Sequence, residues 1–416
     1  MAAGKTKVAV KALLAGKPMP IEVRATATQF LGMPVDRFLR NYWQKAPLLI
    51  RQALPGYVAP LTPEDLAGLA CEDAALSRLV RHDRKTDRWT VRSGPFAESE
   101  FPKLGQRDWT LLVQDMDKWD VDVRALLRHF RFLPAWRVDD VMISFATPGG
   151  SVGPHVDQYD VFLLQAQGRR RWQIDSAADA PRDFRADAEL KLLARFTPSH
   201  EWVLEPGDIL YLPPGVPHHG EAVDACMTFS IGMRAPSSAE LLVDLAEEVA
   251  ASLPEEQRYA DPDLRTSGDA FQIDAAAMDR VEQTLAAMQS ADAGARRDWF
   301  GRFITRYRAA GEIVAAPRTP RWPTVEKSLA AGGTLQRHPF TRSACAATPE
   351  RGTQAATLFV SGDAWPMRRH SAQALAASDV LDAAAVAALD ADARSALQAL
   401  HASGHYRLAS APRKRG

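Results

Sequence analysis

Between residues 138 and 232 the chain alternates short apolar runs with turns that contain glycine or proline. The runs are too short for buried helices, and they are rich in the β-branched and aromatic residues that favour strands. Several short strands separated by turn signals are typical of a β-sandwich or a β-barrel. The sequence therefore predicts an all-β unit in this part of the chain.

Two segments of this region are each expected to form a pair of strands. DVFLLQAQGRRRWQID reads as a hairpin with its turn at Gln167–Gly168, and EWVLEPGDILYL reads as two strands around Pro206–Asp208. The following PPGVPHHG is expected to be a loop, because proline and glycine interrupt both helices and strands. Further strands are expected at 88–96 and 108–114.

The composition changes near residue 236, where Ser237 and Glu240 form a capping box that starts a helix. Mostly helical sequence follows, then a proline-rich linker and a small α+β segment. Two apolar stripes in the helical part exceed what a short helical segment is expected to bury alone, so a homodimer interface is predicted there. The stripes are Leu242, Leu245, Val249 and Leu253, and Trp299, Phe303 and Tyr307. The expected division is a disordered basic tail at 1–26, the β-rich domain at 27–236, the helical region at 237–318 and a last domain at 319–416.

Charge and cysteine content narrow the class of protein. Lys and Arg together number 51, as do Asp and Glu, so the net charge is 0. This balance argues against a protein that wraps nucleic acid by charge, although it leaves a local basic patch open. The 3 cysteines form no CxxC pair, which argues against a disulfide framework or a thiolate zinc site. The cytoplasm is the expected location, and no uncharged run is long enough to cross a membrane.

A histidine and an aspartate occupy alternate positions, His155 and Asp157, in SVGPHVDQYDVFL. Side chains at i and i+2 of a strand project to the same face, so one metal ion can bind both, although a polar turn also explains such a pair. His218, in PGDILYLPPGVPHHG, completes a two-histidine, one-carboxylate set. That set binds iron(II) and leaves positions open for O₂ and a cosubstrate. His219 is the rival third ligand, and adjacent side chains point apart, so only one of the two is expected to bind.

Arg170 is expected on the same strand face as Trp172 and Ile174. A cation in apolar surroundings is costly unless it meets an anion, and a planar guanidinium suits a carboxylate. An internal salt bridge would satisfy Arg170, and so would the distal carboxylate of a diacid such as 2-oxoglutarate. Thr228 and Ser230 share a small polar face of ACMTFSIG and are candidates for a further hydrogen bond to that carboxylate.

These motifs resemble the JmjC-type cupin oxygenases, whose metal-site motifs are similar to GPHVDQYDVFLLQAQGRRRW and PGDILYLPPGVPHHG. Within that class the chain is most similar to the bacterial ribosomal oxygenases, because FLRNYWQKAPLLIR, DPDL, WFGRFITR and LFVSGDAW also resemble that family. The resemblance covers nearly the whole chain. It implies an α+β architecture with a double-stranded β-helix (cupin/JmjC), a helical dimerisation region and a C-terminal winged-helix-like domain.

The resemblance also implies a dioxygenase that uses iron(II), 2-oxoglutarate and O₂ to hydroxylate a side chain of a large-subunit ribosomal protein, with arginine C3 as the expected position. His155, Asp157 and His218 would bind the iron, and Arg170 would bind 2-oxoglutarate. Other side chains lie on segments expected to reach the mouth of the cleft. These substrate-contact candidates are Gln114, Asp115, Asp117, Asp139, Asp140 and Tyr159.

Three alternatives remain on sequence grounds. The first is hydroxylation of a histidine or another residue by the same chemistry. The second is a transcription regulator that joins a ligand-sensing cupin to a winged-helix DNA reader. Its helices, SAQALAASDVL and AAAVAALDADARSALQALHA, carry few cations, so no direct DNA binding is expected. The third is a cupin that binds metal without oxygenase chemistry, which leaves the inward Arg170 unexplained.

Overall fold

The computed structural model describes residues 19–262, 264, 273–290, 292–308, 311 and 313–409. Most of the predicted basic tail, Asp263 of the DPDL motif and the basic C-terminus lie outside the described residues. The chain divides into two compact units between Ala235 and Pro236, and each is described by itself.

The first unit is built mainly from strands. They are β1 (Glu22–Arg24), β2 (Leu48–Arg51), β3 (Ser77–Asp83), β4 (Arg88–Ser93), β5 (Trp109–Val113), β6 (Val138–Ala146), β7 (His155–Val156), β8 (Val161–Gln167), β9 (Arg170–Ile174), β10 (His200–Leu204), β11 (Ile209–Leu212), β12 (Pro217–Ala222) and β13 (Cys226–Met233). The α-helices of this unit are α1 (Val35–Asn41), α2 (Pro63–Leu69), α3 (Met116–Trp119) and α4 (Val121–Leu126).

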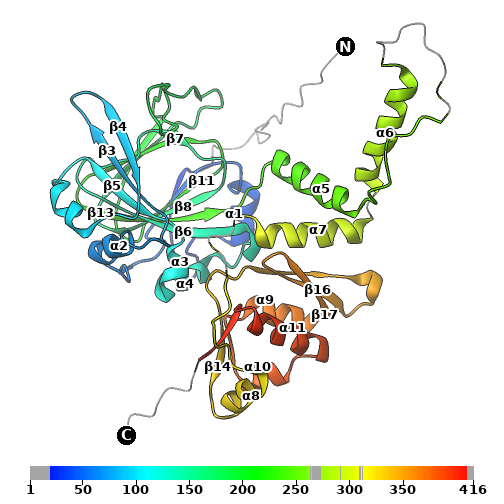
Figure 1. Ribbon diagram of the computed structural model, residues 1–416. Helices are drawn as coiled ribbons and strands as arrows, with labels where there is room; N and C mark the ends of the chain where they lie inside the picture. Colours follow the sequence, from blue (N-terminus) through cyan, green and yellow to red (C-terminus); the bar gives the residue numbers. More distant parts are fainter. Residues whose placement is uncertain are drawn as a thin grey trace. The chain divides into compact units, whose positions relative to one another are not determined.

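These strands form two sheets (Figure 1). The larger has 9 strands in the order β1-β2-β11-β8-β13-β6-β5-β3-β4, and the smaller has 4 in the order β10-β9-β12-β7. From β7 to β13 successive strands alternate between the two sheets, except that β9 and β10 are neighbours in the smaller one. This is the winding of a double-stranded β-helix. The predicted α+β fold with a β-rich N-terminal domain is confirmed.

Two expectations about the strands are wrong. β8 and β9 are joined at Gly168, as expected, but they lie in different sheets and form no hairpin. The two strands expected around Pro206–Asp208 are confirmed as β10 and β11, which also lie in different sheets. Gly168 has φ +61°, and its α-carbon lies so close to the carbonyl of Ala225 that a β-carbon would come within 2.2 Å of that oxygen. The chain therefore turns a corner between sheets here. The predicted loop at 213–220 contains strand β12, whose partners β7 and β9 are supplied by distant sequence.

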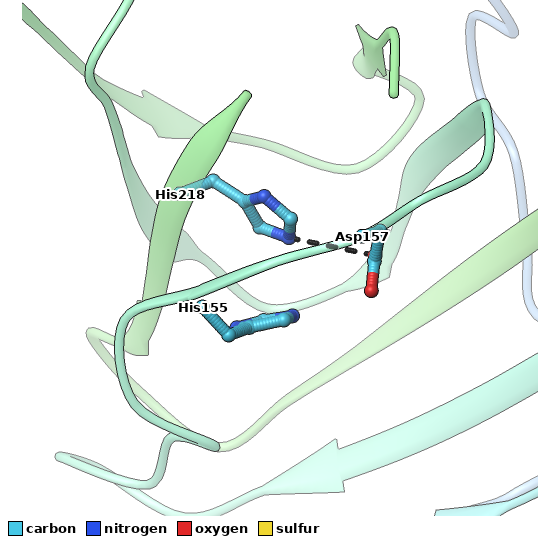
Figure 2. Close-up of side chains that lie close together, drawn as sticks. All are labelled: His155, Asp157 and His218. Atoms are coloured by element: carbon cyan, nitrogen blue, oxygen red, sulfur yellow. Dashed lines mark ion pairs between the residues drawn. The ribbon is translucent and has the colours of Figure 1, made fainter. Parts of the chain in front are cut away.

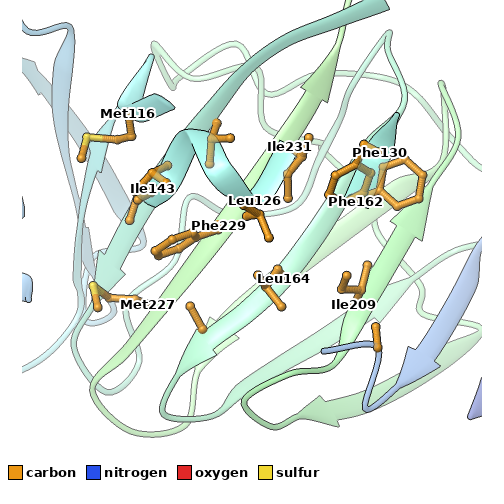
Figure 3. Close-up of a cluster of buried hydrophobic side chains, with 14 of the residues drawn as sticks. Met116, Leu126, Phe130, Ile143, Phe162, Leu164, Ile209, Met227, Phe229 and Ile231 are labelled. Carbon is orange, nitrogen blue, oxygen red and sulfur yellow. The ribbon is translucent and has the colours of Figure 1, made fainter. Parts of the chain in front are cut away.

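The apolar core lies on both sides of the larger sheet, and strand β8 shows why. Phe162 and Leu164 pack into the main cluster on one face, together with residues of α1, α2, α3 and α4 (Figure 3). Val161 and Leu163 pack on the other face, against side chains of the smaller sheet such as Trp172. A strand buried on both faces reads as a continuous apolar run, as VFLL does.

The second unit contains helices and two small sheets. Its helices are α5 (Ser238–Ser252), α6 (Ala275–Ser290), α7 (Ala293–Arg306), α8 (Trp322–Ala330), α9 (Arg369–Ala377), α10 (Ala383–Ala387) and α11 (Ala391–Ala402). Its strands are β14 (Thr334–Arg337), β15 (Ser343–Ala347), β16 (Ala355–Val360), β17 (Asp363–Arg368), β18 (Val380–Leu381) and β19 (Tyr406–Ala409). They pair in the orders β18-β14-β19 and β15-β16-β17. None of the helices that the structure describes is long and apolar enough to cross a bilayer.

Helix α7 packs against the sheet β15-β16-β17 of the same unit. Gly301 lets the helix approach this sheet, because a β-carbon there would lie 2.4 Å from the ring of Phe359. Phe303 and Tyr307 are buried within the chain. The expectation that a partner chain is needed to cover this stripe is therefore wrong for these two residues. Helix α5 differs, since it contains no buried residue and exposes 60% of Leu242 and 58% of Val243.

Candidate functional site

The three predicted metal ligands come together at one edge of the smaller sheet. His155 lies on β7, Asp157 follows that strand, and His218 lies on β12, directly opposite His155 in the antiparallel register. Figure 2 shows the three side chains converging from these two segments. One ligand atom from each lies within 4.8 Å of the others. The i, i+2 spacing and the strand register thus create one cluster from two distant segments.

The geometry of this cluster suits one small cation. Nε2 of His218 lies 3.7 Å from a carboxylate oxygen of Asp157, and the rings of His155 and His218 are 4.2 Å apart at their centroids. His218 is buried, while the other two side chains are half-buried. The cluster is therefore enclosed on one side and open on the other, so that further ligands can reach an ion held there.

Backbone carbonyls set the tautomer of both histidines. Nδ1 of His155 lies 2.9 Å from the carbonyl oxygen of Gly153, and Nδ1 of His218 lies 2.9 Å from that of Val216. A carbonyl only accepts, so each Nδ1 carries the proton and each Nε2 keeps its lone pair for a metal. Burial, and next the proximity of His155, lowers the pKa of His218 to about 4. His218 is therefore neutral near pH 7, the form that binds a metal.

His219 points away from this cluster. Strand alternation places it on the opposite face of β12 from His218, and its ring contacts Phe196 at 6.2 Å between centroids. Burial lowers the pKa of His219 to about 4, so this side chain is also neutral near pH 7. The expectation that only one of the two adjacent histidines joins the cluster agrees with this arrangement.

The loop before His155 is shaped by Gly153. Its φ is +77°, and a β-carbon there would lie 2.6 Å from the side chain of Leu192 and 3.3 Å from the indole of Trp89. Glycine avoids both the strain of a positive φ and these contacts. The same residue offers the carbonyl that orients His155, so packing around Gly153 positions a metal ligand.

Arg170 is buried on the same face of the smaller sheet as His218. It lies opposite Ala222 of β12, as Ile174 lies opposite His218, so the two residues belong to one inward-facing row. The guanidinium donates from Nη1 to Ser144 and Thr228 at 3.2 Å each, and it lies over the ring of Trp172.

Arg170 has no internal counter-ion among the residues that the structure describes. Its Nε has no hydrogen-bond partner, and in the part of the chain that the structure describes no salt bridge reaches its guanidinium. Burial lowers its pKa from the ordinary value. An anion brought to this position would remove both costs, because it would pair with the charge and occupy the unused donor. The alternative of an internal salt bridge is therefore absent among the described residues.

Two polar side chains around Arg170 were not expected from the sequence. Ser144 lies on β6 and contacts the guanidinium directly, while Gln165 of β8 accepts a hydrogen bond from Thr228 at 3.1 Å. A serine and a glutamine inside otherwise apolar strands could have indicated these contacts, because a buried polar side chain needs a hydrogen-bond partner. Ser230 is buried on the same strand as Thr228, and its role stays a prediction.

Asp140 is a half-buried carboxylate on β6. One of its oxygens accepts a hydrogen bond from the backbone N–H of Asp115 at 3.1 Å. Burial, and next the charge of Asp115, raises the pKa of Asp140 to about 7. Burial, and next the charges of Asp157 and Asp140, also raises the pKa of the Tyr159 phenol. The two groups offer a carboxylate and a hydroxyl to a substrate.

The other acidic candidates already have partners. Asp139 accepts from Arg234 at 3.1 Å, and Asp117 pairs with Lys118 at 2.7 Å and accepts from the backbone of Val141. Asp115 lies 3.4 Å from the same lysine. These carboxylates are therefore partly neutralised, whereas Asp140 has no salt bridge among the described residues. Gln114 is half-buried beside them, and its role stays a prediction.

Comparison with protein-family models gives three matches. The JmjC domain model matches residues 125–241, which include all three residues of the metal cluster and Arg170. The ROXA-like winged helix model matches residues 291–407. A model of the AraC-like ligand binding domain matches residues 192–297, a range that contains neither His155 nor Asp157.

Comparison with individual proteins gives long matches. The chain is 38% identical over 286 residues to "Ribosomal protein uL16 3-hydroxylase" of Escherichia coli K12, covering 69% of this chain and 75% of that protein. The crystal structure of E. coli ycfD matches with a TM-score of 0.79 and 34% identity, over 91% of this chain and 99% of that one. A structure of the same E. coli ribosomal oxygenase with cobalt and 2-oxoglutarate matches with a TM-score of 0.75 and 33% identity, over 91% and 99% of the two chains.

Proposed function

Since this chain belongs to the JmjC-type ribosomal oxygenase family, we propose that it is a metal- and 2-oxoglutarate-dependent hydroxylase of ribosomal protein uL16. The proposed modification is hydroxylation of an arginine side chain at C3. The observation that carries the proposal is a three-residue metal cluster and an unpaired buried arginine in one row of the same sheet. Such a pair of features serves a metal and an anionic cosubstrate together.

We propose iron(II) as the metal. Two imidazole nitrogens with free lone pairs and one carboxylate are the donor set that non-haem iron(II) takes in oxygenases. His155 and His218 would bind through Nε2 and Asp157 through a carboxylate oxygen. The ion supplies the activation of O₂ that oxidation of an unactivated C–H bond requires.

We propose that Arg170 binds the distal carboxylate of 2-oxoglutarate. Its free Nε and its buried charge favour a carboxylate over a neutral group, and the fork of the guanidinium favours a bidentate contact. Thr228 accepts from the guanidinium and would have to turn its hydroxyl from Gln165 to donate to the same carboxylate, and Ser230 is the further candidate on that strand. This contact orients the cosubstrate toward the metal cluster along the row of inward side chains.

We propose that Asp140 and Tyr159 hold the substrate guanidinium, with Gln114 at the rim and Asp139 acting through Arg234. A carboxylate without a cationic partner among the described residues is complementary to arginine, and it is only fully ionised once a cation arrives. Positioning then selects the carbon that is oxidised, because the side chain is fixed at its charged end.

We propose a homodimer formed through the helical region 237–318, and the cytoplasm as the compartment. Helix α5 is tied to α7 by polar contacts, including Asp244 with Arg306 at 2.8 Å and Glu240 with Tyr307 at 3.0 Å. Its apolar residues Leu242 and Val243 stay exposed, which supports a second chain as their partner. The three unpaired cysteines support a reducing compartment.

The test incubates the protein with iron(II), 2-oxoglutarate, ascorbate and overlapping fragments of uL16, and locates added oxygen by tandem mass spectrometry. The expected result is a gain of about 16 Da on one arginine that depends on every component. His155→Ala should abolish the gain and His219→Ala, its matched histidine outside the cluster, should retain most of it. If the added oxygen is found on a histidine, the substrate side chain is histidine and not arginine. Fragments that stay unmodified while full-length uL16 also stays unmodified would overturn it.

A further inference from the structure

A basic hollow lies on the hairpin formed by β3 and β4. It has a volume of about 640 Å³ and is lined by side chains from both strands, their turn and the segment before β5. The lining residues are Arg81, His82, Asp83, Arg84, Lys85, Arg88, Thr90, Arg107 and Asp108. Five of these side chains are Lys or Arg and two are Asp, so cations outnumber anions although the whole chain has a net charge of 0.

The two carboxylates of the hollow are already engaged. Asp108 pairs with Arg84 at 2.7 Å. Asp83 accepts from the backbone N–H of Lys85 at 2.9 Å and from the hydroxyl of Thr86 at 2.8 Å, so it closes the hairpin turn. Arg88 lies opposite Asp83 in the strand register, yet no ion pair within 4.0 Å joins them.

Four cations of the hollow are left without an ion pair. Among the residues that the structure describes, no carboxylate lies within 4.0 Å of the charged group of Arg81, Lys85, Arg88 or Arg107. Each of these side chains lies on the exposed surface. Three neighbouring arginines, Arg84, Arg92 and Arg185, each have a carboxylate partner. Like charges gathered around one hollow repel one another, and an anion relieves that repulsion.

The hollow is separate from the metal cluster. The other face of the hairpin carries Trp89 and His82, whose rings stack at 3.9 Å between centroids, and His82 lines the hollow from this face. Trp89 packs toward Gly153 in the loop before His155. The face that carries Arg81 and Arg88 points the opposite way, because neighbouring residues of a strand alternate. The hairpin therefore supports the catalytic loop with one face and presents cations with the other.

We propose that this hollow binds the phosphates of single-stranded RNA, so that the hydroxylase docks on ribosomal RNA next to its protein substrate. Guanidinium groups suit phosphate because they offer paired donors to its oxygens, and three of the four unpaired cations are arginines. The choice of RNA rests on the proposed function, since a substrate that is a ribosomal protein is met together with ribosomal RNA. An exposed row of cations binds a flexible polyanion through charge with little sequence preference.

The test measures fluorescence anisotropy of a labelled oligouridylate of about 12 nucleotides with the full chain, at salt concentrations between about 50 and 200 mM. Four phosphate contacts predict that log Kd rises with log salt with a slope of about 3. The variant R81Q/K85Q/R88Q/R107Q should weaken binding at least tenfold at the lowest salt and reduce the slope to below about 1. The control R37Q/R40Q/R128Q/R131Q removes the same charge from exposed arginines elsewhere and should leave Kd within about twofold.

Other anionic probes distinguish binding of RNA from binding of an acidic protein or of free phosphate. Oligoglutamate of the same charge should bind at least tenfold more weakly than the RNA; equal binding that the fourfold variant abolishes would assign the hollow to an acidic protein and overturn the proposal. The proposal would also be overturned if inorganic phosphate bound but the RNA did not, or if the fourfold variant and the control bound the RNA equally. Hydroxylation of short uL16 fragments should be the same in the fourfold variant and the wild type. If the wild-type protein fails to hydroxylate the uL16 fragments, the proposed function is contradicted. The RNA titration does not depend on hydroxylation and therefore tests the docking proposal separately.

Discussion

The fold buries the side chain of Arg170 and half-buries that of Asp140, and this loss of contact with water shifts their pKa values in opposite directions. It lowers the pKa of Arg170 and raises that of Asp140 to about 7. Both shifts mean that the charged form is less stable than in water. Each residue therefore gains when a group of opposite charge arrives, an anion at Arg170 and a cation at Asp140. The site is thus prepared for two ligands of opposite charge at two distinct positions.

Replacing Arg170 tests the first position. Arg170→Ala should raise the KM for 2-oxoglutarate by about 30- to 1000-fold, because a charge-assisted contact in a partly dry site contributes roughly 2–4 kcal/mol. Arg170→Lys should give an intermediate KM, since the ammonium keeps the charge but loses the fork. Steady-state turnover of 2-oxoglutarate measures both. Arg169→Ala is the control, because that exposed neighbour pairs with Asp224; an unchanged KM in Arg170→Ala would remove the assigned role.

The pKa of Asp140 predicts a pH dependence. A substrate guanidinium binds the carboxylate form, so the KM for the uL16 fragment should fall as the pH rises toward 7, by up to about tenfold per unit, and level off above 7. The same raised pKa means that the folded protein binds this proton more tightly than the unfolded chain. The contribution of Asp140 to the free energy of unfolding should therefore decrease as the pH rises from about 4 to 7.

The measurement is the KM between pH 5.5 and 8.5 for the wild type and for Asp140→Asn, whose KM should be high and flat. Asp36→Asn serves as the control, because Asp36 is an exposed carboxylate in the first turn of α1 and has no role in the proposed substrate site. A wild-type profile that Asp140→Asn leaves unchanged would show that another group titrates.

At the scale of elements, the loop before β7 combines backbone strain and close packing. Gly153 has a positive φ and lies against Leu192 and Trp89, which come from two other segments of the chain. The long connection between β9 and β10 therefore holds the catalytic loop in place through Leu192. This packing, rather than the strand β7 alone, determines where His155 lies.

Gly153→Ala should destabilise the protein and weaken the metal site. The positive φ costs about 1–2 kcal/mol, and relieving the clash with Leu192 adds about 1–3 kcal/mol. Gly56→Ala is a matched control, because Gly56 has φ +68° and no atom within 4 Å of the new β-carbon. Urea denaturation should therefore give a larger loss for Gly153→Ala, together with a lower affinity for iron(II) in equilibrium dialysis. Equal losses for the two variants would mean that Leu192 moves aside freely.

The sequence was sufficient for the metal cluster and for Arg170, and insufficient for some strands around them. An i, i+2 pair and an arginine between apolar neighbours are local patterns with a direct meaning in three dimensions. Strand β12 has no such pattern, because its pairing with β7 and β9 depends on segments distant in sequence. Ser144 was missed for the same reason, since its partner Arg170 lies on the other sheet. Which sheet a strand joins is decided by packing across the molecule.

At the scale of the whole molecule, the net charge of 0 conceals a separation of charge within the first unit. Unpaired cations gather around the hollow of the β3–β4 hairpin, whereas Asp140 lies close to two further carboxylates, Asp115 and Asp139. A balanced total therefore excludes neither a basic nor an acidic surface. The second unit adds exposed apolar side chains on α5, so each surface suits a different kind of partner.

The exposed face of α5 predicts the oligomeric state. Light scattering at micromolar concentration should give twice the chain mass of 45.6 kDa. Leu242→Asp combined with Val243→Asp should shift the protein to the monomer, because two charges would be buried in the interface. Val58→Asp is the control, since Val58 is 82% exposed in the other unit and has no proposed partner. A wild-type mass of one chain, or a dimer that survives the double substitution, would contradict this prediction.

Strand β7 has only 2 residues, and its single neighbour in the sheet is β12. An ion shared by His155, Asp157 and His218 would cross-link these segments as a disulfide cross-links a loop. Because the ion binds the folded chain alone, it adds about 2.7 kcal/mol to the free energy of unfolding at a hundredfold excess over its Kd. Chelation should therefore lower the melting temperature, and amide hydrogen exchange should accelerate at β7 before it does so at the central strand β8. A bound metal ion would therefore stabilise the edge of the smaller sheet at β7 as well as take part in the reaction.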